Sequence, residues 1–575
     1  MKKTIIFCIL ILTLVLVVAL SGGRKEEADE IAPVQEESKP VFDADPGVII
    51  VSPAGDMKIK FWTDENGQCL LFLPAFVKEE KVRLSFDEEK YSVLLDGREG
   101  KDGETLELSS LPEKIKLRSL SIGTADDTEY DLVCMRSADI PAVFINTASL
   151  EMGEIDADKE VSDKAEYFGI NPDGSLDHSG VLEMIRARGN SSFQAYKKSY
   201  RLKFSQVCGP FGMSADKSFI LQANAYDNTR IRNTLAYTMA DELGLPYTPQ
   251  FMPVDLYLNN DYAGNYLFLE SVKVSSGRVD IKGDDSFLLE VIQDEKRLDD
   301  RYFSFFSGQT FLQVNYPEKP DGKARRFCQG RVEELDRIIE SLSPEESLDD
   351  LSRIADVPSF ADMFLFDFVT NEIDAGNYST YLYIDGRDKK VYMGPVWDYD
   401  KAWGNEKKKN ELIEFNAYSW RRPELLFDNY EYQALVKEKI PDLMDITDKM
   451  VAEGIDEMSE RIRASVEMDV VRNGNKGGQS VNEESMDGDL TQLKDYLKGR
   501  MRLLYDVTEH GDEYCRVYVR EKTGRLFWVK KGESLTTKEL DFGRRLFGCD
   551  GFALEDGCAL DEGFVINEDC VVLPK

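Results

Sequence analysis

Three acidic residues, Asp374, Asp398 and Asp400, have the types and spacing of a metal and proton-transfer site. Asp398 and Asp400 alternate directly after two short apolar runs that predict a β-hairpin over 381–393. Residues two apart on an extended chain project to one face, so both carboxylates can reach one hard cation. Asp374 precedes the hairpin by seven residues. The alternative is a surface hairpin with solvated acids, because the whole chain is acidic.

A polar turn and its basic neighbours form a candidate phosphate site. The glycine of the turn lets backbone N–H groups approach a phosphate, and the flanking basic side chains supply charge. Most turns of this composition bind no ligand. The turn therefore indicates a phosphate site only in combination with the three acids. Lys203, on the other face of its strand, is the rival of Lys198 for the phosphate role. The candidate residues are Arg188, Gly189, Asn190, Ser191, Lys198 and Lys203.

The elements around these residues predict an α+β fold with two lobes. Strands are predicted at 182–188, 198–204 and 219–223, followed by a helix over 229–243 and a hairpin over 254–270. The turn, the acids and the second hairpin then follow the order of a protein kinase, in which the first Asp accepts the substrate hydroxyl proton and the second holds Mg²⁺. Further helices predict a mostly helical second lobe at 331–341, 359–369, 431–444, 446–466 and 489–504.

The amino-acid composition limits the binding partners and the kinds of metal or catalytic site that this chain can have. The formal net charge of −36 argues against nucleic acid or an anionic membrane as a general partner. The chain has only two histidines, so a His-rich zinc site or a Ser-His-Asp triad is not expected. A metal would be bound by oxygen, which indicates Mg²⁺, Mn²⁺ or Ca²⁺.

The chain divides into five predicted segments. A charged start and an apolar run predict a signal peptide, so the protein is expected to be secreted or at the cell surface, with an uncleaved membrane anchor as the alternative. Eight cysteines follow Cys8, which permits disulfides of undetermined pairing or free thiols. The predicted segments are a signal peptide (1–21), a disordered acidic linker (22–45), a β-sandwich-like module (46–137), a kinase-like domain (138–507) and a small Cys-containing β module (508–575).

Several motifs in the same order resemble the CotH (spore coat protein H) kinase family, a secreted, atypical branch of the protein-kinase-like fold. The resemblance covers about 140–507 and leaves the flanking modules uncovered. The motifs are Arg188-Gly-Asn-Ser-Ser with Lys198-Ser-Tyr-Arg-Leu-Lys-Phe, Asn224-Ala-Tyr-Asp with Ile231-Arg-Asn-Thr, Leu256-Tyr-Leu-Asn with Glu270, Asn371 with Asp374, and Gly394-Pro-Val-Trp-Asp-Tyr-Asp-Lys-Ala-Trp-Gly404.

The resemblance implies transfer of the ATP γ-phosphate to Ser or Thr of secreted, surface or spore-coat proteins with Mg²⁺ or Mn²⁺. By motif, Asp374 is the catalytic Asp, which accepts the hydroxyl proton. Asp398 is a metal ligand and Asp400 a possible second one. Lys198 would contact the nucleotide phosphates, the Gly189 turn would cover them, and Glu270 would lie near the adenine or the hinge. The expected acceptor is a Ser/Thr- and Lys/Arg-rich protein, because an acidic enzyme favours basic targets through its field.

One position departs from ordinary kinases. They place an Asn five residues after the catalytic Asp as a second metal ligand, and here Ser379 stands there. A hydroxyl is a poorer ligand, and Asn377 or Asp400 are the residues that can compensate. Two alternatives stay open: a non-catalytic surface or coat scaffold that kept the fold, and a kinase whose acceptor is a glycan or a small molecule.

Overall fold

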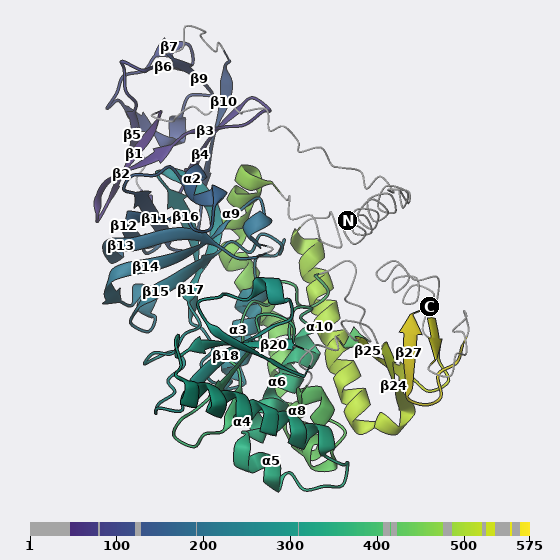
Figure 1. Cartoon of the computed structure of the whole chain (residues 1–575). Coiled ribbons are helices and arrows are strands. Elements are labelled where there is room, and N and C mark those ends of the chain that lie inside the picture. The colour runs from purple at the N-terminus through teal and green to yellow at the C-terminus, as the bar shows by residue number, and fades with distance from the viewer. Residues whose placement is uncertain are drawn as a thin grey trace, which may run out of the picture.

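The computed structural model describes residues 46–78, 81–120, 128–190, 192–308, 310–405, 414–415, 422–474, 486–519, 525–534, 552–554 and 564–574. The predicted signal peptide, the predicted linker and Ser191 lie outside these residues. Within the described residues, no helix has the length and apolar character needed to cross a membrane. The fold is mixed α+β, with sheets in every part of the chain and most helices after residue 320 (Figure 1).

The first part of the chain forms two sheets that enclose one hydrophobic core, drawn in purple in Figure 1. A four-stranded sheet has the order β2-β1-β5-β8, and a six-stranded sheet has the order β3-β4-β10-β9-β6-β7. Alternating buried and exposed residues, as in β5, explain why these segments form half-buried strands. The strands are β1 Gly47–Ser52, β2 Gly55–Lys60, β3 Trp62–Thr63, β4 Gln68–Leu73, β5 Lys81–Ser85, β6 Tyr91–Leu95, β7 Arg98–Glu99, β8 Thr105–Glu107, β9 Lys114–Ser119 and β10 Tyr130–Arg136, with a short helix η1 Leu108–Ser110.

A closed barrel follows, in the order β11-β12-β13-β14-β15-β17-β16. It contains the strands predicted from the sequence, and the predicted helix over 229–243 is α3. The core of the two N-terminal sheets continues into the barrel through Phe144, Tyr257 and Tyr262, so the two parts pack as neighbours. The elements are β11 Ala142–Thr147, α2 Met152–Ala157, β12 Asp163–Ile170, β13 Leu176–Arg188, η2 Ser192–Gln194, β14 Ser199–Cys208, η3 Pro210–Gly212, β15 Asp216–Gln222, α3 Arg232–Glu242, β16 Phe251–Leu258 and β17 Asp261–Glu270.

The next part combines a five-stranded sheet, in the order β19-β20-β18-β21-β22, with most of the helices. The sequence predicted its hairpin β21–β22 but not the strands at 287–316. Its elements are β18 Phe287–Ile292, η4 Glu295–Arg297, β19 Phe303–Ser307, β20 Thr310–Tyr316, α4 Gly322–Ser341, α5 Asp349–Ile354, α6 Val357–Thr370, β21 Tyr381–Ile384, β22 Val391–Met393, α7 Arg422–Leu426, α8 Tyr430–Lys449, η5 Met450–Gly454, α9 Ile455–Asn473 and α10 Met486–Glu509.

A last sheet, in the order β23-β25-β24-β27-β26, lies beside α10 (Figure 1). The six described cysteines of the chain are free thiols, and Cys549 and Cys558 lie outside the described residues. The elements are β23 Glu414–Phe415, η6 Gly511–Glu513, β24 Tyr514–Val519, β25 Arg525–Lys530, β26 Phe552–Leu554 and β27 Cys570–Pro574.

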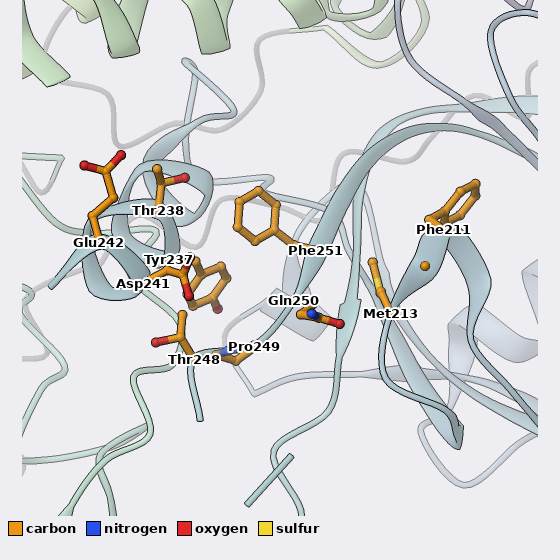
Figure 2. Close-up of a pocket in the computed structure, with 11 residues that line it drawn as sticks. Phe211, Met213, Tyr237, Thr238, Asp241, Glu242, Thr248, Pro249, Gln250 and Phe251 are labelled. Carbon is orange, nitrogen blue, oxygen red and sulfur yellow. The ribbon is translucent and has the colours of Figure 1, made fainter. Parts of the chain in front are cut away.

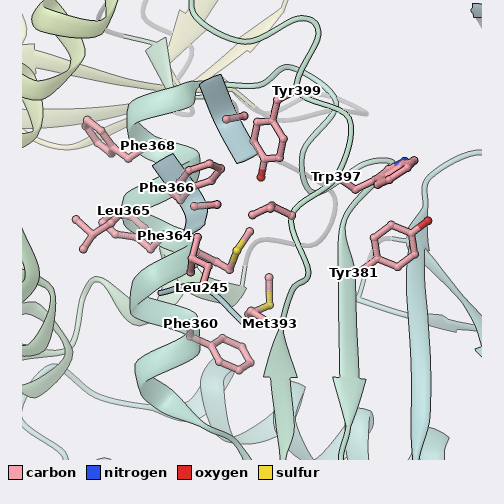
Figure 3. Close-up of a cluster of buried hydrophobic side chains, with 14 of the residues drawn as sticks. Leu245, Phe360, Phe364, Leu365, Phe366, Phe368, Tyr381, Met393, Trp397 and Tyr399 are labelled. Carbon is pink, nitrogen blue, oxygen red and sulfur yellow. The ribbon is translucent and has the colours of Figure 1, made fainter. Parts of the chain in front are cut away.

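Helix α6 is the element that positions the predicted acids. It is apolar on nearly all sides, and such a helix is stable only inside a core. Figure 3 shows Phe366 of α6 beside Tyr399 and Phe360 near Met393, which come from the segment after the hairpin and from the end of the hairpin. The segment with Asp374 leaves the end of α6, and the segment with Asp398 passes beside it. One buried helix therefore holds both acid-bearing segments.

Candidate active site

The first acid lies in the segment between α6 and β21, here called the Asp374 loop (371–380). Asn371 ends α6 in a left-handed conformation, with a φ of 45°, which turns the chain out of the helix. The backbone N–H groups of Asn377 and Tyr378 donate to the Asp374 carbonyl oxygen at 3.0 and 2.8 Å. These bonds close a tight turn, so the Asp374 side chain is presented from a fixed backbone.

The second acid lies in the segment after the hairpin, here called the Asp398 loop (396–405). Asp398 has a φ of 66°, and two barrel-side groups hold it. The Gln222 amide donates to its carboxylate at 2.6 Å, and the Asp398 N–H donates to the Tyr237 hydroxyl at 3.2 Å. The next N–H, of Tyr399, donates to Asn233 Oδ1 at 2.7 Å. Strand β15 and helix α3 therefore fix this loop from the barrel side.

Two residues join the loops. The Lys401 ammonium lies 2.9 Å from the Asp374 carboxylate. The buried Glu372 carboxylate accepts the Asp374 N–H at 3.1 Å and the Lys401 N–H at 3.0 Å. Glu372 and Lys401 are here called the clasp. The clasp brings Asp374 next to the loop that carries Asp398 and Asp400.

The electrostatics of this cluster favour a bound cation. Burial raises the pKa of Asp398, and burial and the Asp398 carboxylate raise the pKa of Asp400 well above its usual range. Burial and Asp374 do the same to the pKa of Glu372. The surrounding carboxylates outweigh burial for Lys401 and raise the pKa of its ammonium. Acids whose charged forms are this costly gain most from a positive ion.

The donor set fits Mg²⁺ or Mn²⁺. Among the described residues, no three His, Cys, Asp or Glu side chains are grouped closely enough to hold a metal by themselves. Mg²⁺ in phosphoryl-transfer sites is typically bound by one or two carboxylates together with substrate phosphates and water. Asp398 and Asp400, whose charges act on each other, are the two carboxylates that would hold the ion. Ser379, the third predicted ligand, lies in the Asp374 loop with a φ of 55°.

The predicted phosphate turn lies partly beside the acids. Arg188 ends β13, and its guanidinium lies 5.6 Å from the centre of the Trp397 ring and acts on the pKa of Asp398. Gly189 has a φ of 107°, and a Cβ there would lie 1.9 Å from Ser192 Oγ, so only glycine fits this turn. Asn190 Oδ1 accepts from Lys159 at 3.4 Å.

The two predicted lysines are engaged elsewhere. Lys198 Nζ donates to the carbonyl oxygens of Phe193 and Ala195 at 2.7 and 2.9 Å. Lys203 lies 2.9 Å from Glu183 in a half-exposed ion pair. Gln222, rather than a lysine, reaches Asp398 from the barrel.

Glu270 is the last residue of β17. Its described hydrogen bonds and ion pair involve no residue of the acid cluster. Its buried carboxylate accepts the N–H groups of Ser214 and Gln250 at 3.0 and 3.1 Å. Gln250 also lines a cavity of about 400 Å³ between α3 and the segments at 211–213 and 248–251 (Figure 2). Tyr237 lines the same cavity, so one aromatic ring connects it to the Asp398 backbone.

Sequence reasoning missed four residues of the site: Gln222, Tyr237, Glu372 and Lys401. Glu372 and Lys401 are neighbours of the predicted acids in sequence, so charge pattern alone was a usable signal for them. Gln222 and Tyr237 carried no such signal, because their role depends on which face of β15 and α3 meets the Asp398 loop. Arg232 and Asn233 also hold this loop: Arg232 Nε donates to the Ala402 carbonyl oxygen at 3.0 Å, and Asn233 Oδ1 accepts the Tyr399 N–H.

Comparisons with known proteins agree with the motifs. The family model described as "CotH kinase protein" matches residues 185–504, which is more than half of the chain and includes both acid-bearing loops. No curated protein matches the chain. One matching solved structure is the crystal structure of the Helicobacter pylori proinflammatory kinase CtkA, with 9% identity and a TM-score of 0.26, covering 54% of this chain and 93% of that one. The chain belongs to the CotH kinase family.

Proposed function

We propose that this protein is an atypical protein kinase that transfers the γ-phosphate of ATP to Ser or Thr hydroxyls. The observation that carries the proposal is the clasp. It joins Asp374 to the loop of Asp398 and Asp400, as phosphoryl transfer requires for a proton acceptor beside a metal site. Membership of the CotH kinase family supports the same reaction. We also propose that the kinase-like domain has two lobes and that the active site lies between them.

Each residue has a role in the proposed transfer. Asp374 accepts the hydroxyl proton as the acceptor oxygen bonds to the γ-phosphorus, and the bond to the bridging oxygen breaks to release ADP. Asp398 and Asp400 would hold Mg²⁺ or Mn²⁺, which neutralises charge on the phosphates. Arg188 lies beside Asp398, and together with the Gly189 turn that follows it in sequence it would contact the phosphates. The reaction needs mainly positioning and charge neutralisation, which these groups supply.

The proposed acceptors are exported proteins. The predicted signal peptide supports a location outside the cell or at its surface, where Ser/Thr-containing surface or coat proteins would be the acceptors. The net charge of −36 favours basic acceptors at long range.

The first test is transfer of labelled γ-phosphate from ATP, with Mg²⁺ or Mn²⁺, to the protein itself and to Ser-containing peptides. We expect Asp374→Asn to reduce the rate by about 10²–10⁴-fold, the range for loss of a general base, and Asp398→Asn or chelation of the metal to abolish it. Asp388→Asn is the matched control, because this acid lies in the exposed hairpin turn and pairs with the Tyr392 hydroxyl.

Two outcomes would replace this proposal. If wild type and variants are equally inactive and ATP does not raise the melting temperature, the protein is a non-catalytic scaffold with this fold. If ATP binds and is consumed but no protein or peptide is labelled, the acceptor is a glycan or a small molecule.

A further inference from the structure

A group of basic side chains borders the two acid-bearing loops in this strongly acidic chain. It is here called the basic cluster. Its members come from four separate places: the segment after α2, the end of β13, strand β14 and the helix η4. Arg201 and Arg297 are exposed and the others are half-buried. The members are Lys159, Arg186, Arg188, Arg201 and Arg297.

The strand pair β13–β14 holds like charges against each other. Arg186 and Arg201 are directly opposite in the antiparallel register, and Arg188 follows two residues later on the same face. Like charges in this position destabilise a sheet. Burial and then the charges of Arg188 and Arg186 lower the pKa of Arg201. Arg186 Nε is buried and has no hydrogen-bond partner in the described part of the chain.

Lys159 and Arg297 bring the cluster to the Asp374 loop. Burial, Arg297 and Arg188 together lower the pKa of Lys159, so these three charges are within electrostatic reach of one another. The Arg297 guanidinium lies 4.3 Å from the centre of the Tyr378 ring. The Tyr378 N–H donates to the Asp374 carbonyl oxygen at 2.8 Å. The cluster therefore extends from the side of Asp398 to the side of Asp374.

No member of the basic cluster forms an ion pair with a described residue. The Asp299 carboxylate, on which the Arg186 charge acts, is already held by Arg301, whose Nε lies 2.9 Å from it. Charges act locally here, because screening limits their range to about 8–10 Å at physiological salt. Arg188 faces the Asp398 and Glu290 carboxylates. Lys159, Arg201 and Arg297 converge with no ion-pair partner among the described residues, which indicates an anionic ligand even in a chain whose total charge is −36.

We propose that the basic cluster binds an acidic segment of the acceptor protein, with carboxylate or phosphorylated side chains close to the Ser or Thr that is modified. This rests on the proposed kinase function. Arg188 is closest to Asp398 and serves the nucleotide phosphates, whereas Arg297 adjoins the Asp374 loop, where the acceptor hydroxyl must lie. Near the site, the basic cluster therefore favours acidic residues around the modified Ser or Thr. The net charge of the chain, which acts at longer range, favours a basic acceptor.

The test uses three peptides with one Ser each, flanked by acidic, neutral or basic residues. Enzymes are the wild type, Arg201→Gln, Arg297→Gln and the control Arg353→Gln, which removes an exposed arginine from α5. We expect the acidic peptide to have the lowest KM. We expect each cluster variant to raise that KM about tenfold, the size of one lost charge-assisted contact, with kcat and the KM for ATP unchanged. The control should match wild type.

A binding arm separates this proposal from the kinase proposal. Fluorescence anisotropy measures binding of the acidic peptide with Ala in place of Ser, at two salt concentrations. Salt-sensitive binding that the cluster variants lose supports the anion site even if no transfer is detected, in which case only the kinase function fails. Preference for the basic peptide, or variants that raise only the KM for ATP, would overturn the proposal, and the second result would assign the cluster to the nucleotide.

Discussion

Lys401 is the residue on which the placement of Asp374 depends most directly. Its side chain is only 18% exposed, and its ammonium pairs with the carboxylate that is proposed to take the proton. The Glu372 carboxylate holds the backbone N–H groups of both residues, so the geometry of one loop is transmitted to the other. Removing the Lys401 charge would free Asp374 to rotate, and Asp398 and Asp400 would lose one positive charge that favours their ionised forms.

We predict that Lys401→Met lowers kcat about 100-fold, because misplacing a catalytic group by about 1 Å costs that much, and leaves the KM for ATP nearly unchanged. Lys401→Arg should recover part of the loss by restoring the ion pair. Steady-state kinetics with peptide and ATP varied separately provides the measurement.

Lys389→Met is the control for this change, since Lys389 pairs with Asp285 at the exposed end of the hairpin. A variant with normal kcat and a raised KM for ATP would show that Lys401 serves the nucleotide instead of Asp374.

At the scale of elements, helix α9 is tied to the barrel by a buried ion triad. The Asp469 carboxylate lies 3.0 Å from both Lys197 Nζ and Arg230 Nε, and all three side chains are almost fully buried. Gly264 allows this approach, because a Cβ there would lie 2.1 Å from Asp469 Oδ1. A triad of this kind fixes the barrel against the helical part that carries the Asp374 loop.

We predict that Asp469→Asn destabilises the protein by about 3–5 kcal/mol, because two buried cations lose their counter-charge. Thermal and urea unfolding provide the measurement. Asp261→Asn is the control: it breaks the half-exposed pair with Arg472 at the same junction and should cost under about 1 kcal/mol. An equal decrease in the free energy of unfolding of the two variants would show that the buried triad stabilises the protein no more than a half-exposed ion pair does.

At the scale of the whole molecule, Asp255 marks the place where three parts of the chain meet. It lies on β16 in the barrel, and its carboxylate accepts the hydroxyls of Tyr262 at 2.9 Å and of Ser465, on α9, at 2.6 Å. Tyr262 also belongs to the core that the barrel shares with the N-terminal sheets. Burial raises the pKa of Asp255 to about 6.

This shift predicts a pH-dependent stability. Because the folded state favours the protonated acid, the contribution of Asp255 is fully present below its unfolded pKa of about 3.9 and is lost as the pH rises through about 6. Asp255→Asn removes this dependence. The stability of the variant relative to wild type should therefore increase by roughly 2 kcal/mol between pH 4.5 and pH 7.5, because about a third of the effect of a two-unit shift already lies below pH 4.5.

Melting temperatures at the two pH values provide the measurement for Asp255→Asn. Comparing differences cancels any constant cost of the amide. A relative stability that does not change with pH would mean that the Asp255 carboxyl keeps an ordinary pKa in the folded protein.

The sequence by itself determined the family of this protein and indicated the three acids that are proposed to carry its chemistry. Asp374, Asp398 and Asp400 were identified from their types and spacing, and the family followed from motifs in a fixed order, which the family match over 185–504 confirms. Strands and helices with strong local patterns, such as those of the barrel and α3, were also predictable, because alternation and capping act over a few residues.

Only the tertiary structure decided which side chains meet the acids. The choice of Gln222 and Arg188 over Lys198 and Lys203 depends on which strand face turns toward the Asp398 loop, and a shift of one residue reverses that face. The clasp and the basic cluster join residues from segments far apart in sequence, and nothing local in those segments specifies their meeting. Packing around α6 brings the two loops of the clasp together, and the β13–β14 register sets the strand part of the basic cluster, because long-range packing fixes positions that local patterns leave undetermined.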